Sequence, residues 1–407
     1  MKNIHFGQQF TTSDIYMLST LLSSTEVTNN SQTDSADVDL EKAGKWLWKI
    51  CSVVVLLFGL TGNLLTILVL RKIGVSKRPT FIFLFVLAIT DSVVLVTGLS
   101  RYWILNTFDL DVRTLSDFGC KFNLFVIYLS MQYSSWILVF VCIERVIKTH
   151  FPLQFIRIVT YRRVCVSLII LFVFLSGVDL HYFWTNGIKN VTTGVCNSLN
   201  DEYGEFDDFV FVYIDFTFLS AAPFVLMFIC NVFLVRALKN IQRGRASMMH
   251  NSIFRQTKRV SDKLTKMLVV STCYFLIATV PVSVVFIVDS YRKHSVENSD
   301  RHGNAIFDFV RTITYLIQFS NYSVNFYLYS MVNGKFWTKL KIVCGCQKEK
   351  KRSTIISYKQ NSQTPPPNSS LRTKESEEEL ATIAEVDINL TGLETKASLS
   401  EIESVVE

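Results

Sequence analysis

A single carboxylate, Asp91, interrupts an apolar stretch that otherwise runs from Thr80 to Ser100. A lone acid inside a membrane segment is costly to bury, so such a residue is by default a candidate functional group. Other apolar segments supply polar residues that could face it, and these are Asn63, Ser134, Asn321 and Asn325. Oxygen ligands around one negative charge suit a small hard cation. The alternative is a hydrogen-bond network among the same side chains, without an ion.

These polar residues need long apolar helices to hold them, and the composition provides such helices. The chain has 407 residues, of which 49% are hydrophobic and only 18% are charged. A soluble protein of this length would carry more charge and would break its apolar runs sooner. We therefore predict an all-α membrane protein, a seven-helix bundle with a short amphipathic eighth helix. The expected spans are about 46–70, 79–104, 119–147, 162–184, 209–237, 261–289 and 308–332, and the expected surface helix is 334–344.

The loops between these spans differ in charge. Lys and Arg follow the first and third spans and surround the connection from the fifth span to the sixth, whereas Asp and Glu gather before the third and fifth spans. Cytoplasmic loops of membrane proteins carry the excess of Lys and Arg. This pattern predicts an extracellular amino-terminal tail over residues 1–45 and a multi-pass protein of the plasma membrane. Residues 347–407 are expected to form a disordered cytoplasmic tail, because their composition is too polar to fold.

The nine cysteines sort by compartment. Cys120 and Cys196 are the two that this orientation places outside, where thiols oxidise, so we predict a disulfide between them. Cys344 and Cys346 follow the expected surface helix and are candidates for palmitoylation, the alternative being unmodified cytosolic cysteines. Two sequons for N-linked glycosylation lie in segments that are predicted to face outside, and they begin at Asn29 and Asn190.

The third span carries several landmarks at a defined spacing. Cys120 stands before it, Glu144-Arg145-Val146 closes it, and Pro152-Leu153 follows in the next loop. In this combination the segment resembles the third helix of rhodopsin-like (class A) G protein-coupled receptors, with Val146 in place of the usual aromatic residue. The resemblance in spacing covers about residues 46–346. The chain is similar to invertebrate neuropeptide receptors of the FMRFamide or thyrotropin-releasing-hormone type.

The resemblance implies roles for residues in the other spans. It places an allosteric sodium ion in the pocket around Asp91, with Ser134, Asn321 and Asn325. It assigns G protein coupling to the inner ends of the helices, at Glu144, Arg145, Lys258, Arg259 and Tyr329. It assigns the activation switch to the middle of the bundle, at Asn63, Pro223, Phe275 and Pro281. The chain departs from the family pattern at Thr279, where a tryptophan is usual, and at Phe326, where a proline is usual.

The outer ends of the helices bear on the ligand. Amine receptors keep an Asp where this chain has Ile127, and opsins need a lysine that the seventh span lacks. The candidate ligand-binding residues combine both charges with aromatic rings, and they are Arg101, Tyr102, Tyr128, Met131, Gln132, Asp215, Phe286, Asp289, Arg311 and Tyr315. Such a lining suits a peptide better than a lipid. For each charged member, an internal salt bridge is the alternative to ligand contact.

We therefore expect a receptor and not an enzyme. It would bind an extracellular peptide and activate a heterotrimeric G protein, with arrestin and receptor kinases acting on its phosphorylatable tail. Membrane lipid would surround it, nucleic acid would have no part, and no cofactor is expected apart from the sodium ion. A lipid or chemosensory receptor of the same fold, and a transporter or channel, are the alternatives. The sequence has no internal repeat that favours a transporter and no catalytic motif that favours an enzyme.

Overall fold

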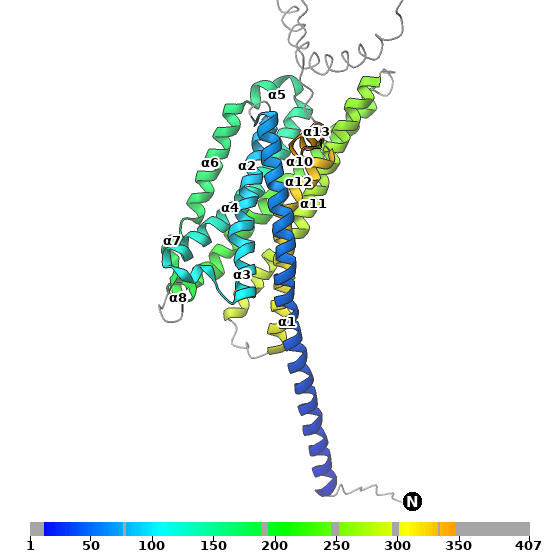
Figure 1. Cartoon of the computed structure of the whole chain (residues 1–407). Helices are drawn as coiled ribbons and strands as arrows, with labels where there is room; N and C mark the ends of the chain where they lie inside the picture. Colours follow the sequence, from blue (N-terminus) through cyan, green and yellow to red (C-terminus); the bar gives the residue numbers. More distant parts are fainter. Residues whose placement is uncertain are drawn as a thin grey trace, which may run out of the picture. The chain divides into compact units, whose positions relative to one another are not determined.

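The computed structural model describes residues 12–75, 79–188, 194–245, 252–294, 301–332 and 334–346. Long helices form almost all of this part of the chain, and they pack side by side in one bundle (Figure 1). The predicted all-α membrane fold is confirmed. The expected disordered tail, residues 347–407, lies outside the described residues.

Within the described residues, the helices follow seven paths through the bundle. These are α1 (Thr12–Ile73); α2 (Pro79–Val94), η2 (Leu95–Leu99) and α3 (Ser100–Phe108); α4 (Asp117–His150); α6 (Tyr161–Asp179) and α7 (Tyr182–Thr185); α8 (Asp201–Phe206), η4 (Asp207–Phe211), α9 (Val212–Asp215), η5 (Phe216–Ala221) and α10 (Ala222–Arg245); α11 (Ser252–His294); and α12 (Arg301–Val332). Shorter elements connect them, and these are η3 (Val112–Leu115), α5 (Pro152–Ile158), β1 (Asn186–Ile188), β2 (Cys196–Ser198) and α13 (Gly334–Val343).

Six of the seven paths contain a helix that is long and apolar enough to cross a membrane. The seventh path, α12, is 32 residues long but falls short in hydropathy because it carries polar residues such as Gln318, Asn321 and Asn325. Those side chains are buried. The helix packs against α1 and α11, so its polar face meets protein and not lipid. This arrangement explains why α12 can span the bundle with a modest apolar content.

The first helix begins much earlier than expected. α1 starts at Thr12 and runs through the expected span 46–70 to Ile73, so the helix extends into the segment that was expected to be a tail. Glu41 and Lys45 form an ion pair one turn apart at 2.9 Å, which supports helix in this polar segment. Trp48 donates a hydrogen bond from Nε1 to Oγ1 of Thr312 at 3.2 Å, which holds the helix against α12. Other helices also run past the expected ends, because an apolar run marks only the part of a helix that lies in the membrane.

Three segments of π-helix were not expected from the sequence. η2 interrupts the second path, and η4 and η5 flank α9 in the fifth. η5 and η2 each offer a backbone carbonyl to a side chain of α4. Trp136 donates to the Phe218 oxygen of η5 at 2.9 Å, and Asn123 donates to the Thr97 oxygen of η2 at 3.3 Å. π-Turns are often found at functional sites. Here they place Asp215 on a single turn of α-helix between two π segments.

The core contains a close approach between α1 and α12 at Phe326. This residue replaces the expected proline, and α12 is continuous through it. A Cβ atom at Gly62 would lie 3.0 Å from the Phe326 Cβ, so the absence of a side chain at Gly62 makes room for the phenylalanine. Phe326 is buried with Leu70 and Phe81. The ring therefore joins α1, α2 and α12 where a proline would have bent the last of them.

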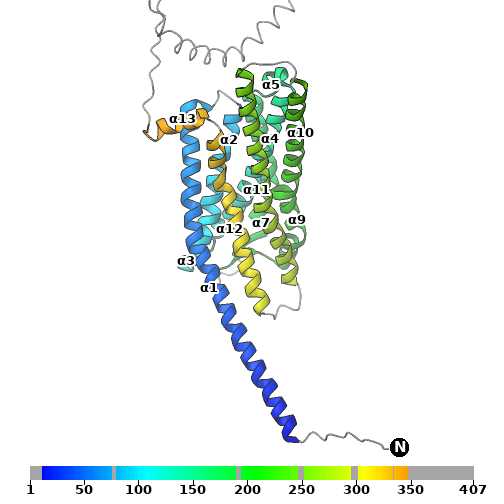
Figure 2. The ribbon, with the colours of Figure 1, turned by 90° about the vertical axis from the view of Figure 1, so that its right-hand side faces the viewer.

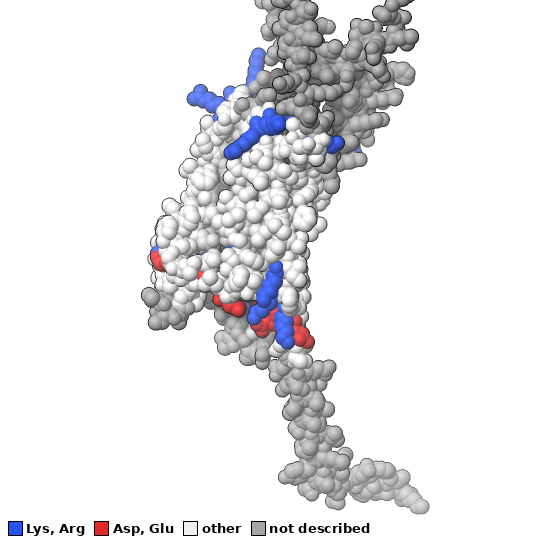
Figure 3. Space-filling view, in the orientation of Figure 1, with Lys and Arg blue, Asp and Glu red and all other residues white. Residues whose placement is uncertain are grey.

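The two ends of the bundle differ. Figure 2 shows α13 lying across the same end as α5, while α3 lies at the opposite end. Near α3, the Cys120–Cys196 disulfide joins the start of α4 to β2, so the predicted pairing is confirmed. Strands β1 and β2 form an antiparallel hairpin in which Gly187 pairs with Asn197. On the face drawn in Figure 3, uncharged side chains cover the middle, and Asp and Glu gather toward the end that carries α3.

Candidate functional site

A buried polar centre forms around Asp91 in the middle of the bundle. Asp91 is fully buried, and its two carboxylate oxygens accept hydrogen bonds from Ser134 Oγ at 2.6 Å and Asn325 Nδ2 at 2.8 Å. These bonds join α2, α4 and α12. Asn63 of α1 is buried, and its Nδ2 donates to the Tyr322 carbonyl of α12 at 3.1 Å. Among the hydrogen bonds of the described residues, none joins Asn321 to Asp91.

The residues at this centre fit a sodium ion in part. The Asp91 carboxylate and the Ser134 hydroxyl are oxygen ligands of the kind that hard cations prefer. Asn325 presents its amide nitrogen to Asp91, which is a donor and not a ligand. The geometry therefore shows the hydrogen-bond network that was the alternative expectation, and the sodium site stays a prediction.

The inner end of α4 carries the two coupling residues that the structure describes. Glu144 is buried, with 3% of its surface exposed, and one carboxylate oxygen accepts a hydrogen bond from Thr80 at the start of α2. Its other oxygen, Oε2, has no partner among the described residues. Arg145 is partly buried. The ion pairs of the described residues do not include one to Arg145. The side chains of Tyr329, Lys258 and Arg259 lie outside the described residues, as do Asn190 and the side chain of Asn29.

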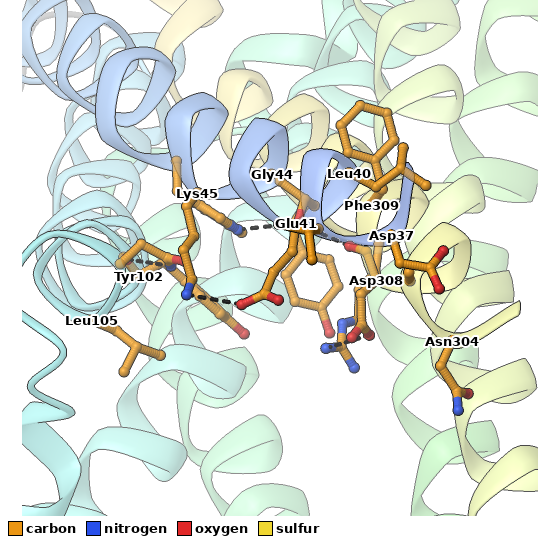
Figure 4. Close-up of a pocket in the computed structure, with 17 residues that line it drawn as sticks. Asp37, Leu40, Glu41, Gly44, Lys45, Tyr102, Leu105, Asn304, Asp308 and Phe309 are labelled. Atoms are coloured by element: carbon orange, nitrogen blue, oxygen red, sulfur yellow. Dashed lines mark hydrogen bonds and ion pairs between the residues drawn. The ribbon is translucent and has the colours of Figure 1, made fainter. Parts of the chain in front are cut away.

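A cavity of about 400 Å³ lies among the outer ends of α1, α3 and α12. Three of the candidate ligand-binding residues line it, and they are Tyr102, Arg311 and Tyr315. Figure 4 shows Glu41 and Lys45 of α1 between Tyr102 of α3 and Asp308 of α12. The α1 wall was missed from the sequence because that segment was expected to be a tail. Trp48, at the start of the expected first span, also lines the cavity.

Aromatic rings form the floor of this cavity. Trp48 stacks on Tyr102 with ring centroids 4.6 Å apart. Tyr315 meets the edge of Tyr102 at 5.5 Å and lies 5.4 Å from Phe286. The charged residue above them, Arg311, pairs with Asp308 at 2.9 Å and with Asp289 at 3.6 Å. The structure therefore brings five candidate ligand-binding residues together across α3, α11 and α12, with rings below and charges of both signs above.

Arg101 lies beside this group and makes an internal salt bridge. Its guanidinium donates to both oxygens of Asp111, at 2.9 Å from Nε and 2.7 Å from Nη2. Arg113 adds a further contact to Asp111 from Nη2 at 2.9 Å. Burial disfavours the ionised form of Asp111, but the hydrogen bonds and charges of the two arginines outweigh it and hold the pKa of Asp111 well below its usual range. For Arg101 the structure thus shows the internal pairing that was the alternative to ligand contact.

A second group of candidate ligand-binding residues lies deeper, between α4, α6 and α9. The amide of Gln132 donates to Asp215 Oδ1 at 3.1 Å and to Asp179 Oδ1 at 3.3 Å. One turn outward on α4, Tyr128 stacks on Tyr182 with centroids 5.0 Å apart. Asp179 is the last residue of α6 and was not among the candidate ligand-binding residues. Nothing in the sequence indicated that it would share an amide with Asp215.

Met131, on the neighbouring face of α4, connects the two groups. It is buried and lies 3.9 Å from the Gln318 amide nitrogen of α12. Leu219, Phe319 and Tyr322 belong to the same buried cluster. The candidate ligand-binding residues therefore divide into an outer group at the cavity and an inner group at Gln132, with Met131 between them.

Three of the four expected switch residues lie on α10 and α11, whereas Asn63 lies on α1. Phe275 is fully buried, and Pro281 is inside α11. At the position of the usual tryptophan, Thr279 is buried and accepts a hydrogen bond from Ser220 of η5 at 3.1 Å. About two turns below Pro223 on the same path, Asn231 of α10 donates to Thr272 at 2.7 Å. Hydrogen bonds thus join α11 to the fifth path where the family has large aromatic side chains.

Comparison with known proteins gives one family. The model for the 7 transmembrane receptor (rhodopsin family) matches residues 62–329. The Galanin receptor 2a of Danio rerio is 24% identical over 314 residues, which cover 74% of this chain and 80% of the receptor. The Thyrotropin-releasing hormone receptor of Mus musculus is 22% identical over 334 residues, which cover 75% of this chain and 80% of the receptor.

The matched region begins inside α1 and ends inside α12, so it contains all seven helical paths, the disulfide and the Asp91 centre. The family match covers more than half of the chain and falls on a bundle with these helices. This multi-pass membrane protein belongs to the rhodopsin family of seven-transmembrane receptors.

Proposed function

We propose that this receptor is activated by an extracellular peptide and that it activates a heterotrimeric G protein at the plasma membrane. The observation that carries the proposal is the cavity of about 400 Å³ at the outer ends of α1, α3 and α12. It combines stacked aromatic rings with charges of both signs, and such a lining recognises side chains and backbone of a peptide better than a lipid tail. The matched relatives include receptors for galanin and for thyrotropin-releasing hormone.

The charge distribution supports an outward-facing cavity. Asp37, Glu41 and Asp308 line the cavity, and Asp111 lies in the adjacent loop. The opposite end carries Arg157 and Arg163 around α5 and Lys341 on α13. Because cytoplasmic loops carry the excess of Lys and Arg, the end with α5 and α13 faces the cytoplasm. The start of α1 then lies outside. Figure 3 lets the reader follow this division on one face.

Activation requires that the ligand bind two conformations with different affinities. In the resemblance that the sequence shows to the family, the active state moves the sixth helix outward and frees Arg145 for the G protein. The structure supports this role through position: Arg145 lies next to Glu144 on the inner end of α4, and Glu144 is held by Thr80. A peptide that pulls α1, α3 and α12 together at the cavity would bias the bundle from the outer end. Arrestin and receptor kinases would act on the residues after 346.

The test is ligand-dependent nucleotide exchange. The full-length receptor is reconstituted in lipid nanodiscs with a panel of heterotrimeric G proteins, and GTPγS uptake is measured against a library of amidated neuropeptides. We expect at least one peptide to accelerate uptake in a saturable way. Arg145→Ala should remove that acceleration while leaving peptide binding and surface level near normal.

Two further variants sharpen the test. Arg157→Ala changes a basic residue of the same end that is not assigned to coupling, and it serves as the matched control for Arg145→Ala. Tyr102→Ala should weaken peptide binding because Tyr102 joins Trp48 and Tyr315 in the cavity floor. Uptake that no peptide changes, or uptake that lipids change and peptides do not, would contradict the proposal.

A further inference from the structure

Two buried carboxylates share one amide in the outer half of the bundle. Asp179 of α6 is fully buried, and Asp215 of α9 has only 6% of its surface exposed. The Gln132 amide of α4 donates one hydrogen bond to each of them, at 3.3 Å and 3.1 Å. We call these three residues the Gln132 cluster. An amide group offers two N–H donors, so Gln132 has no further donor for either acid.

The Gln132 cluster leaves acceptors without donors. Asp179 Oδ2 and Gln132 Oε1 are buried and have no hydrogen-bond partner among the described residues. The ion pairs found in the described part of the chain also include none to Asp179 or Asp215. A buried acceptor without a donor costs about 1–3 kcal/mol, and a buried charge without a counter-charge costs more. A positively charged group with several N–H donors would satisfy these acceptors and offset the charge of the acids.

His181, two residues after Asp179 in the chain, does not supply this group. Its Nδ1–H donates to the Val178 carbonyl at 3.0 Å. Its other nitrogen, Nε2, lies 3.8 Å from Asp207 and has no hydrogen-bond partner. Asp207 in turn accepts hydrogen bonds from Asn186 and Ser198 of the β hairpin. His181 and Asp207 thus face each other and not Asp179.

Aromatic rings from α4, α7 and η4 pack together one turn outward from Gln132. Tyr128 lies one turn outward from Gln132 on the same face of α4 and keeps some exposed surface. It stacks on Tyr182, and Phe211 meets both rings at centroid distances of 6.1 Å and 5.4 Å. The faces of aromatic rings attract cations such as ammonium and guanidinium groups. η4 carries Phe211, and η4 and η5 flank the turn of α9 that holds Asp215. One of the three rings and one of the two acids therefore belong to the same irregular part of the fifth path.

We propose that the Gln132 cluster binds one monovalent cationic group carried by the ligand, a guanidinium or an ammonium, which reaches it past Tyr128 and Tyr182. A guanidinium has five N–H donors in a planar fork, which suits two carboxylates and an amide oxygen around one point. The group would donate to Asp179 Oδ2 and Gln132 Oε1, the two atoms that now have no donor. This inference deepens the proposed function, since it states which side-chain chemistry the peptide must carry.

The test uses a small cationic probe in place of the unidentified peptide. N-acetyl-arginine methylamide is compared with N-acetyl-citrulline methylamide, which has nearly the same shape but no charge. The full-length receptor in nanodiscs is melted in a sodium-free buffer of N-methylglucamine chloride, and unfolding is followed by tryptophan fluorescence. We expect the arginine compound to raise the melting temperature in a saturable way and the citrulline compound to leave it unchanged.

Substitutions locate the effect. Asp179→Asn and Asp215→Asn keep size and hydrogen-bonding capacity but remove one charge each, and either should weaken the apparent affinity for the arginine compound by about 30-fold or more. Asp117→Asn is the matched control, because it removes a carboxylate from the outer end of α4 that pairs with Lys121 and belongs to neither group of candidate ligand-binding residues, and it should leave the affinity within about twofold. Equal stabilisation by both compounds, or an arginine effect that survives Asp179→Asn and Asp215→Asn, would overturn the proposal.

Two more arms separate other sources of positive charge. In the first, sodium chloride replaces N-methylglucamine chloride. If sodium raises the melting temperature of wild type and of Asp179→Asn but not of Asp91→Asn, the ion binds elsewhere and the proposal is supported. If only Asp179→Asn removes the sodium effect, the Gln132 cluster binds an inorganic ion and the proposal is overturned. In the second, pH is raised from 6 to 8.5. If the rise in pH destabilises wild type but not Asp179→Asn, and the arginine compound does not stabilise wild type, the missing charge is a proton and the proposal is overturned.

Failure here and failure of the proposed function are distinguishable. Probe binding is measured without a G protein, and nucleotide exchange is measured without the probe. A receptor that a neutral peptide activates, with no arginine effect on melting, would refute the Gln132 cluster site and leave the proposed function standing.

Discussion

The Thr80 hydroxyl donates a hydrogen bond to the Glu144 carboxylate, and this bond joins the first turn of α2 to the inner end of α4. Glu144 is buried, and its second oxygen has no partner in the described part of the chain. Within that part, one of the two Glu144 carboxylate oxygens therefore lacks a hydrogen-bond donor, and the bond from Thr80 to the other lowers the cost of burying the charge. Because Arg145 follows directly in the chain, the bond also sets the position of the residue that is proposed to meet the G protein.

Thr80→Val should destabilise the receptor. Valine has nearly the shape of threonine but cannot donate, so the buried Glu144 carboxylate would lose its donor. We expect the free energy of unfolding to fall by about 1–3 kcal/mol, seen as a lower melting temperature in nanodiscs. Thr80→Ser should stay near wild type because it keeps the hydroxyl. Thr66→Val is the matched control, since buried Thr66 donates only to the Gly62 carbonyl of its own helix. Equal losses at positions 80 and 66 would contradict the role of Glu144.

The disulfide should act as a single unit. Cys120→Ser and Cys196→Ser each break the same bond between α4 and β2, so each should lower surface expression and ligand binding to a similar degree, and the double variant should add little. Flow cytometry of an epitope-tagged receptor measures the first quantity. Cys273→Ser, at an exposed free cysteine, is the control and should be neutral. Additive losses in the double variant would speak against the pairing in the native receptor.

Sodium should weaken agonist binding if an ion occupies the Asp91 centre. The family resemblance implies that the ion favours the inactive state, and an ion shifts an equilibrium only through its different affinity for the two states. We expect agonist affinity to fall as sodium replaces N-methylglucamine at constant ionic strength. Asp91→Asn keeps the size and hydrogen bonds of the side chain and should lose this dependence. Wild type without sodium dependence, or Asp91→Asn with it, would leave only the hydrogen-bond network.

The outer ion cluster at Asp111 should make stability depend on pH in acid. Arg101 and Arg113 hold the pKa of Asp111 below its usual range, so the carboxylate stabilises the folded state above about pH 4, the value for an unfolded Asp. This stabilisation is lost as the pH falls from about 4 through the lower pKa of the folded state. We expect wild type to melt above Asp111→Asn at pH 6, with the difference shrinking below pH 4.

Asp109→Asn controls for the general loss of an acid from the same loop. Asp109 lies at the end of α3, where the ion pairs of the described residues do not include it. It should therefore show no pH-dependent difference from wild type. A constant difference between wild type and Asp111→Asn from pH 6 to 3 would mean that the Asp111 charge is not what stabilises this loop.

Local features of the sequence determined much of this protein. The lengths of the apolar runs predicted the spans, because a helix must cover the membrane with about 20 residues. The compartment of Cys120 and Cys196 predicted their disulfide, and the order of Cys120, Glu144-Arg145 and Pro152 carried the family resemblance. Asp91 was recognised because one charge in an apolar run is conspicuous. These signals come from the composition of single segments and from the side of the membrane on which each residue lies, and none of them requires knowing which helices pack together.

Only the tertiary structure decided which polar residues meet. Gln132, Asp179 and Asp215 come from three helices, and the pairing of Thr80 with Glu144 depends on how α2 is rotated against α4. The part of α1 before the expected span also meets α12, where Asp37 accepts a hydrogen bond from His302, and the sequence did not indicate this contact. Helix rotation and register follow from the packing of the whole bundle. A periodic sequence shows that a helix has a buried face, but only the neighbouring helices determine which side chain that face will meet.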